Sequence, residues 1–76
     1  MESEDLMCYA IVIEKAESNY SAYVPDLHGC AATGATVEEA EAQIREAIEF
    51  HLDGLHEDGI PIPFPSSRVE YVDIAA

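Results

Sequence analysis

The segment from residue 37 to residue 57 constrains the fold more than any other part of the chain. Its apolar side chains recur every three or four residues, which is the period of a helix that covers a core on one side. These positions are Val37, Ala40, Ile44, Ala47, Ile48, Leu52 and Leu55. Thr36 and Glu39 form the capping box expected at the start of such a helix, and Gly59 is suited to its left-handed end. A single amphipathic helix needs another layer to cover, so we expect the rest of the chain to form a sheet.

Short apolar segments before this helix predict that sheet. Residues 6–13 are apolar on both faces, a pattern that is typical of a central strand. Residues 20–24 follow a polar turn and form a second strand, which Pro25 ends because proline has no amide proton to donate. Residues 30–33 predict a short third strand, and the close spacing of these segments favours antiparallel pairing.

The segment after the helix is predicted to return to the sheet. Residues 60–65 alternate apolar residues with proline, which favours an extended connector, and residues 69–74 predict a last strand. The order β-β-β-α-β defines an α+β fold, with an antiparallel three-stranded sheet plus a fourth strand and one helix packed on the sheet. A chain of 76 residues allows one domain, over residues 1–76, and we expect residues 1–5 to be frayed and solvated.

The charge of the chain excludes several classes of function. Three Lys and Arg residues stand against sixteen Asp and Glu residues, which gives a formal net charge of −13. A protein that grips nucleic acid or an anionic membrane surface needs the opposite charge. We therefore expect no direct nucleic-acid binding and no membrane binding. The charge favours instead a basic protein partner, drawn in by electrostatic attraction.

The compartment is predicted from the same composition. The most apolar segment, residues 6–13 with the aliphatic run 10–13 at its end, is far shorter than a membrane span. Residues 1–5 are acidic where a secretion signal would be basic, and two cysteines do not make a disulfide framework. These features predict a reduced, cytoplasmic protein.

Three groups of residues were weighed as carriers of chemistry. A metal-dependent nuclease needs clustered carboxylates, but the centre of the first strand is apolar and Glu14 lies only at its end. Cys8, His28 and Cys30 could ligate zinc, although no fourth ligand is evident. A Cys30 nucleophile beside His28 would lack an acid to orient the imidazole. We predict no catalytic residue, no metal site and no cofactor.

Two features of the helix point to contacts instead. His51 falls inside the apolar stripe, so we expect it to be partly buried or to lie at a contact between copies; a pH-sensing or ligand-binding role is the alternative. The acids on the other side of the helix far exceed the nearby cations, unlike those of a neutral solubilising surface. They form either a solvated face or a surface that attracts a cationic partner.

Two motifs in the first half of the chain are specific when taken together. The turn Pro25-Asp26-Leu27-His28-Gly29-Cys30 is followed over residues 33–40 by Thr-Gly-x-Thr-x-Glu-Glu-Ala. As a set they resemble the HicB antitoxin family, and the likeness extends from about residue 7 to residue 74, including the helix segment 44–48 and Gly59. The family usually has Pro at the place of His28, so this turn departs from the pattern.

The resemblance implies a partial ribonuclease H-like fold without nuclease activity, and a role in a type II toxin–antitoxin pair. The implied partner is HicA, a small basic toxin with a double-stranded-RNA-binding-like fold that cleaves mRNA with a catalytic His. The antitoxin domain covers that site and blocks access to RNA. Many members continue into a helix-turn-helix or ribbon-helix-helix domain, whereas this chain stops at Ala76, so operator binding is not expected of it.

We therefore predict a HicB-like antitoxin that acts as a stoichiometric inhibitor and not as an enzyme. Its carboxylates would occupy the phosphate-binding surface of the toxin, and the candidate partner-binding residues are Asp26, Glu46, Glu49 and Asp53. A homo-oligomer, most simply a dimer built from C-terminal segments, is expected because so small a domain has a marginal core. The alternatives are a stand-alone oligomeric regulatory module without a toxin, and a metal-dependent ribonuclease H-like nuclease.

Overall fold

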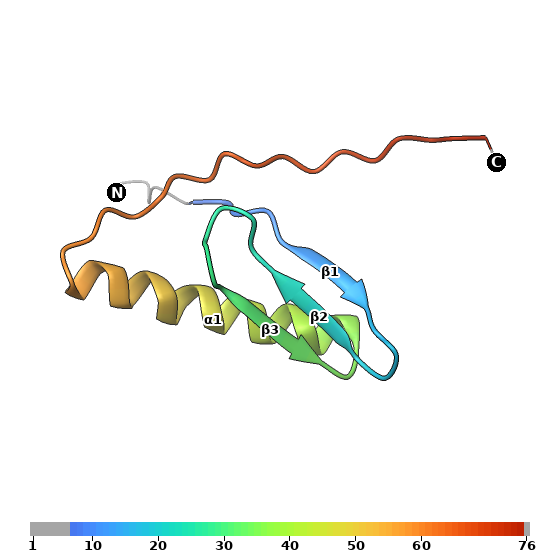
Figure 1. Ribbon diagram of the computed structural model, residues 1–76, viewed down its shortest axis with the longest axis horizontal. Helices are drawn as coiled ribbons and strands as arrows, with labels where there is room; N and C mark the ends of the chain where they lie inside the picture. Colours follow the sequence, from blue (N-terminus) through green and yellow to red (C-terminus); the bar gives the residue numbers. More distant parts are fainter. Residues whose placement is uncertain (1–6, 76) are drawn as a thin grey trace, which may run out of the picture.

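A three-stranded antiparallel sheet packs against one helix, and an extended C-terminal segment crosses over them (Figure 1). The computed structural model describes residues 7–75, so the frayed start predicted for residues 1–5 lies outside this range. The elements are β1 (Val12–Lys15), β2 (Tyr20–Tyr23), β3 (Ala31–Gly34) and α1 (Val37–Glu57). The predicted α+β class and the antiparallel pairing of the first three strands are confirmed.

The inner face of the sheet is lined by small side chains at its centre. Ile13 of β1 lies opposite Ala22 of β2, which in turn lies opposite Ala32 of β3. Residues in register across antiparallel strands share one face, so these three side chains all point toward α1. Ala22 is completely buried there. The alanines leave room for the helix to approach the sheet closely.

Helix α1 begins and ends where the sequence predicts. The Thr36 Oγ1 atom accepts a hydrogen bond of 3.0 Å from the Glu39 amide, and the Glu39 carboxylate reaches back to the amide of Ala35. At the other end, the amides of Gly59 and Ile60 donate to carbonyls of the last turn, and Gly59 has a φ of 70°. This is the Schellman arrangement, which needs a left-handed residue that glycine supplies without steric cost.

The core lies between α1, the inner face of the sheet and the turn that joins β2 to β3. Its buried members are Ala22, Val24, Leu27, Cys30, Ala40 and Ile44, with partly buried apolar side chains packed around them. Leu27 belongs to the turn and not to a strand, and hydrogen bonds between Val24, Leu27 and Cys30 fold that turn back on itself. The turn is therefore an integral part of the core.

The first strand was predicted too early and in the wrong place in the sheet. Pairing with β2 starts at Val12 and runs through Glu14 to Lys15, and Met7–Ile11 pair with no strand among the described residues. The strand order β1-β2-β3 makes β1 an edge, and β2 is the central strand. The prediction failed because the apolar residues from Tyr9 to Ile13 are covered on one side by the helix and only crossed by the C-terminal segment on the other.

The C-terminal segment, residues 60–75, forms an extended arm and not a fourth strand of its own sheet. In residues 7–75 no strand pairs with the predicted strand over residues 69–74. The arm runs back over the molecule from the end of α1 and continues past it (Figure 1). It gives a radius of gyration of 14.6 Å, against about 11 Å for a compact chain of this length. A strand needs a backbone partner, and the arm leaves the body before it meets one.

The close approach of α1 to β3 gives a test of this packing. A Cβ atom at Gly34 would lie 2.8 Å from the Ala40 Cα atom, whereas one at Gly54 would meet open space. We expect Gly34→Ala to lower the free energy of unfolding by about 1–3 kcal/mol, because two backbones must separate. Gly54→Ala, in the last turn of α1, should raise it by up to about 0.5–1 kcal/mol. Urea denaturation followed by circular dichroism measures both, and equal effects would contradict the close contact.

Candidate protein-binding surface

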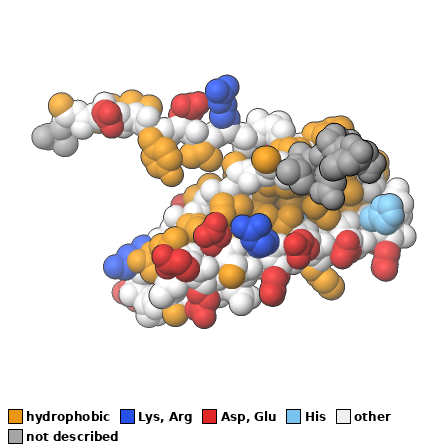
Figure 2. All heavy atoms as spheres, turned by 180° about the vertical axis from the view of Figure 1, so that it is seen from behind, with side chains coloured by type: hydrophobic (Ala, Val, Ile, Leu, Met, Phe, Trp, Pro, Cys, Tyr) orange, Lys and Arg blue, Asp and Glu red, His pale blue; other side chains and the backbone are white. Residues whose placement is uncertain are grey.

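Three of the four predicted partner-binding residues form one exposed row on α1. Glu46, Glu49 and Asp53 are spaced by three and four residues, which places their side chains on one side of the helix. All three are exposed, while Ala40 and Ile44 on the inner side are buried. Acidic side chains follow the helix along the face seen in Figure 2.

The acids of this row have no cationic partner within the part of the chain that the structure describes. The ion pair found there lies elsewhere, between Arg68 and Glu70 of the arm, with Nε and Oε2 3.0 Å apart. Arg45 lies beside the row on α1 but makes no ion pair with it. Unpaired carboxylates keep a negative potential that extends about 10 Å at 0.1 M salt, so the row is a negatively charged strip along the helix.

Phe50 lies within this acidic row and was missed by the sequence analysis. It follows Glu46 by four residues and precedes Asp53 by three, so it lies between them on the helix surface. Its side chain is 82% exposed, which is unusual for an aromatic residue with no role in the core. Its neighbours are acidic on one side, at Glu46 and Asp53, and apolar on the other, at Ala47 and Gly54. Exposed aromatic residues are frequent among the residues that dominate protein-binding energies. The available signal was its position outside the apolar stripe of the helix.

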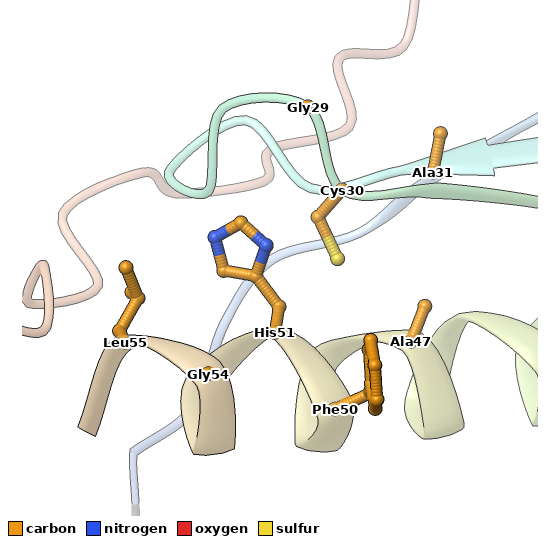
Figure 3. Close-up of a pocket in the computed structure, with 8 residues that line it drawn as sticks. All are labelled: Gly29, Cys30, Ala31, Ala47, Phe50, His51, Gly54 and Leu55. Atoms are coloured by element: carbon orange, nitrogen blue, oxygen red, sulfur yellow. The ribbon is translucent and has the colours of Figure 1, made fainter. Parts of the chain in front are cut away.

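A shallow apolar cavity of about 410 Å³ opens beside Phe50, between α1 and the start of β3. His51 and Cys30 point toward each other across it, and Ala47 and Leu55 complete its helix side (Figure 3). His51 is partly buried, as the sequence predicts. Burial raises the pKa of the Cys30 thiol, which favours the protonated and apolar form of this side chain.

The residues weighed for metal binding and catalysis lie apart. Cys8 is exposed and Cys30 is buried, His28 is exposed in the turn, and Glu14 is exposed on β1. Across residues 7–75, no three His, Cys, Asp or Glu side chains come together in a way that could hold a metal ion. In the same residues, no helix is long and apolar enough to cross a bilayer.

Asp26, the fourth predicted residue, is separate from the helix row and holds the arm. Its carboxylate accepts hydrogen bonds from both the amides and the hydroxyls of Ser66 and Ser67, at 2.9–3.1 Å. These four bonds lower the pKa of Asp26, that from the Ser67 amide having the largest effect. The hydroxyl of Tyr9 donates to the Pro63 carbonyl and fixes the arm at a second point. No local pattern could have predicted a contact across 40 residues of sequence.

Residues 9–75 match the model of a protein family described as HicB-like antitoxin of bacterial toxin–antitoxin systems. A 14.9 kDa uncharacterised protein of Haemophilus phage HP1 is 39% identical over 67 residues, which cover 88% of this chain and 50% of the phage protein. A UPF0150 protein of Helicobacter pylori is 51% identical over 47 residues, covering 62% of this chain and 65% of that protein.

A solved structure shares the fold. A chain of a complex described as the HicA3 and HicB3 toxin–antitoxin complex superposes with a TM-score of 0.68 at 32% identity, covering 79% of this chain and 70% of that one. The chain spans half the length of the phage relative and about two thirds of the Helicobacter one.

The contact between Asp26 and the arm can be tested by pH. Since the folded pKa of Asp26 lies below its usual value of 3.8, the bonds to the arm strengthen above the unfolded pKa and are lost as pH falls through the folded pKa. We expect the amide resonances of Ser66 and Ser67 to titrate together with a midpoint below 3.8.

In Asp26→Asn the titration of these two amides should disappear, and their resonances should move toward random-coil positions at every pH. Asp53→Asn, a matched loss of one carboxylate on α1, should leave the titration unchanged. A midpoint at or above the usual aspartate value would contradict the contact.

Proposed function

The chain belongs to the family of HicB-like antitoxins of bacterial toxin–antitoxin systems, and from this premise we propose that it inhibits a basic HicA-like toxin by covering its RNA-binding surface. The observation that supports this most directly is the exposed row of Glu46, Glu49 and Asp53 with Phe50 between them. The related fold of the HicA3 and HicB3 complex supports a toxin as the partner.

The proposed mechanism is occlusion assisted by charge. A toxin that cleaves mRNA must carry cations that bind phosphates. Carboxylates spaced along α1 meet those cations in place of the RNA, and Phe50 fills an apolar gap between them. Charge sets the speed and orientation of the encounter, and burial of the aromatic ring supplies much of the affinity.

Asp26 enters this proposal as a positioning residue. Its oxygens are occupied by Ser66 and Ser67, so they are not available as ligands for a cation of the toxin while the arm is in place. By holding the arm on the side of the turn, Asp26 keeps residues 60–67 away from the outer face of α1 (Figure 1). The row on the helix therefore stays open to a partner.

The proposed inhibitor acts by binding and not by turnover. This proposal is supported by two observations: no group of His, Cys, Asp or Glu that could hold a metal ion is found among residues 7–75, and Cys30 is buried while His28 is exposed. We propose the cytoplasm as the compartment, because that is where a toxin directed at mRNA acts.

Removal of charge from the row tests its role. The partner is the HicA-type protein that affinity capture from the native host and mass spectrometry identify. We expect Glu46→Gln combined with Asp53→Asn to slow association with this toxin and to reduce its dependence on salt. Stopped-flow association at several salt concentrations measures both quantities.

The pair Glu14→Gln and Glu17→Gln is the matched control, since it makes the same change in net charge at the β1–β2 hairpin. Exposed charges contribute at most a few tenths of a kcal/mol to folding, so all variants should keep the native fold. If both pairs slow association equally, the effect is one of overall charge, and the row is not the interface.

Truncation of the aromatic side chain tests the second half of the mechanism. Phe50→Ala should weaken toxin binding by about 2 kcal/mol or more, which is roughly 30-fold in the dissociation constant. The free energy of unfolding should change by less than about 0.5 kcal/mol, because the ring is 82% exposed. Isothermal titration calorimetry measures the affinity. Phe64→Ala, an equally exposed ring on the arm, is the control and should leave the affinity unchanged.

A further inference from the structure

The edge of the sheet at β1 carries an apolar groove. Helix α1 packs mainly on β3 and β2 and only lightly on β1, so the helix and the first strand diverge. Between α1 and residues 7–11, the segment that leads into β1, lies an open groove of about 560 Å³, whose apolar walls include Ile11, Ile44, Ile48 and Leu52. Within residues 7–75 the outer backbone groups of β1 have no strand partner, because β1 is an edge of the sheet.

The end of the arm, residues 69–74, has the properties of a strand that lacks a sheet. It is extended, and its large side chains are exposed: Val69 50%, Tyr71 93%, Val72 75% and Ile74 76%. It lies apart from the body of its own chain in both views (Figures 1 and 2). A run of exposed, β-forming residues with free backbone groups favours pairing with another edge.

The bonds that hold the arm also direct its end away from the groove of the same chain. Ser66 and Ser67 are fixed to Asp26 in the turn between β2 and β3, and Pro63 is fixed to Tyr9. Past these contacts the arm continues beyond the body (Figure 1). We propose that residues 69–74 of one chain add as an antiparallel fourth strand to β1 of a second copy, which returns its own arm in exchange.

Alternation along both strands selects the face and the register. Ile13 and Lys15 of β1, and Ile11 just before this strand, alternate onto the inner face, because Ile13 lies opposite the buried Ala22. On the arm, Glu70, Val72 and Ile74 share one face. Antiparallel addition with Glu70 opposite Lys15 places Val72 opposite Ile13 and Ile74 opposite Ile11. The apolar pair then covers the groove, and the carboxylate meets the cation at the end of the strand.

The charges at the rim of the groove suit this occupant. Arg45 lies on the groove side of α1 between Glu41 and Glu49, so the rim carries both signs. The inner face of the arm also carries both signs, at Arg68 and Glu70. A strongly basic toxin would be attracted by the acids of this rim but repelled by Arg45. The arm of a second copy carries both signs, so it can place an opposite charge against each sign of the rim. Exchange of two arms around a two-fold axis closes the assembly as a dimer.

The experiment uses the full chain in the absence of toxin, so its result is independent of the proposed function. Light scattering at tens of micromolar should give twice the 8.3 kDa chain mass. The dimer should strengthen as salt rises, because screening weakens the repulsion between two copies that each carry −13. A monomeric chain would overturn the proposal. This holds even if a toxin binds in the groove, because the proposed occupant is a second copy of the chain.

Two substitutions at neighbouring positions test the face of the arm. Val72→Asp places a charge opposite Ile13, on the face turned toward the core, and should weaken the dimer about tenfold or more. Tyr71→Asp makes the same change in charge on the opposite face and should have a much smaller effect. Both residues are exposed in a single chain, so neither variant should lose the helical circular dichroism signal. If both variants weaken the dimer equally, or if neither variant weakens it, the proposed placement of the arm is wrong.

Cross-linking tests the register in a Cys8→Ser background. Ile11→Cys combined with Ile74→Cys should form a covalent dimer under mild oxidation, since opposed residues on antiparallel strands bring their Cβ atoms within disulfide distance. Ile11→Cys combined with Val69→Cys is the control, because residue 69 lies five positions before residue 74 on the arm and is not opposite residue 11 in the proposed register. Comparable dimer bands from both pairs would contradict the proposed register.

Discussion

The packing of one face of α1 on the small residues of β2 and β3 determines what the rest of the molecule can do. Ala22 and Ala32 leave room for the helix, and Ala40 and Ile44 fill that room from the other side. At Gly34 the two backbones are so close that a single methyl group does not fit. Because this contact uses the inner face of the helix, the outer face is free to carry Phe50 and the acids beside it.

The same contact leaves part of the apolar surface uncovered. A helix centred on β2 and β3 cannot also cover β1, so Ile11 and Ile48 border an open groove. The arm carries further apolar residues that its own chain does not bury. In a small domain, where few buried residues support the fold, such surfaces are expected to be buried against a partner. The two unburied surfaces differ in charge and meet at Glu49, which belongs to the acidic row and also lines the groove.

Local sequence signals were sufficient for the elements whose stability is local. The limits of α1 follow from the bonds of Thr36 and Gly59 with their immediate neighbours, and the sequence predicts both residues. The β1–β2 hairpin was predicted as antiparallel, although β1 starts later and lies at the edge. Apolar residues on both faces show that a segment is covered, but they do not distinguish cover by strands from cover by a crossing arm.

Features that depend on distant residues could not be predicted in this way. The strand pattern of residues 69–74 is real, but a strand forms only where a partner edge is within reach, and the bonds of Asp26 to Ser66 and Ser67 direct the arm elsewhere. Asp26 was recognised as important for its acidity, whereas the structure uses it to hold the arm. Helical periodicity did not predict a role for Phe50, because it identifies the apolar residues of the buried face and says nothing about an apolar residue outside that face.

The most direct test of the central claim is to map the toxin interface on the chain by NMR. The ¹⁵N-labelled chain would be titrated with its HicA-type toxin, made inactive at the catalytic His, and the amide resonances followed. We predict that the largest changes fall on α1 around Glu46, Phe50 and Asp53, and that the β1–β2 hairpin is little affected. Changes concentrated on the sheet or the arm, with the outer face of α1 unaffected, would contradict the claim that this face binds the toxin.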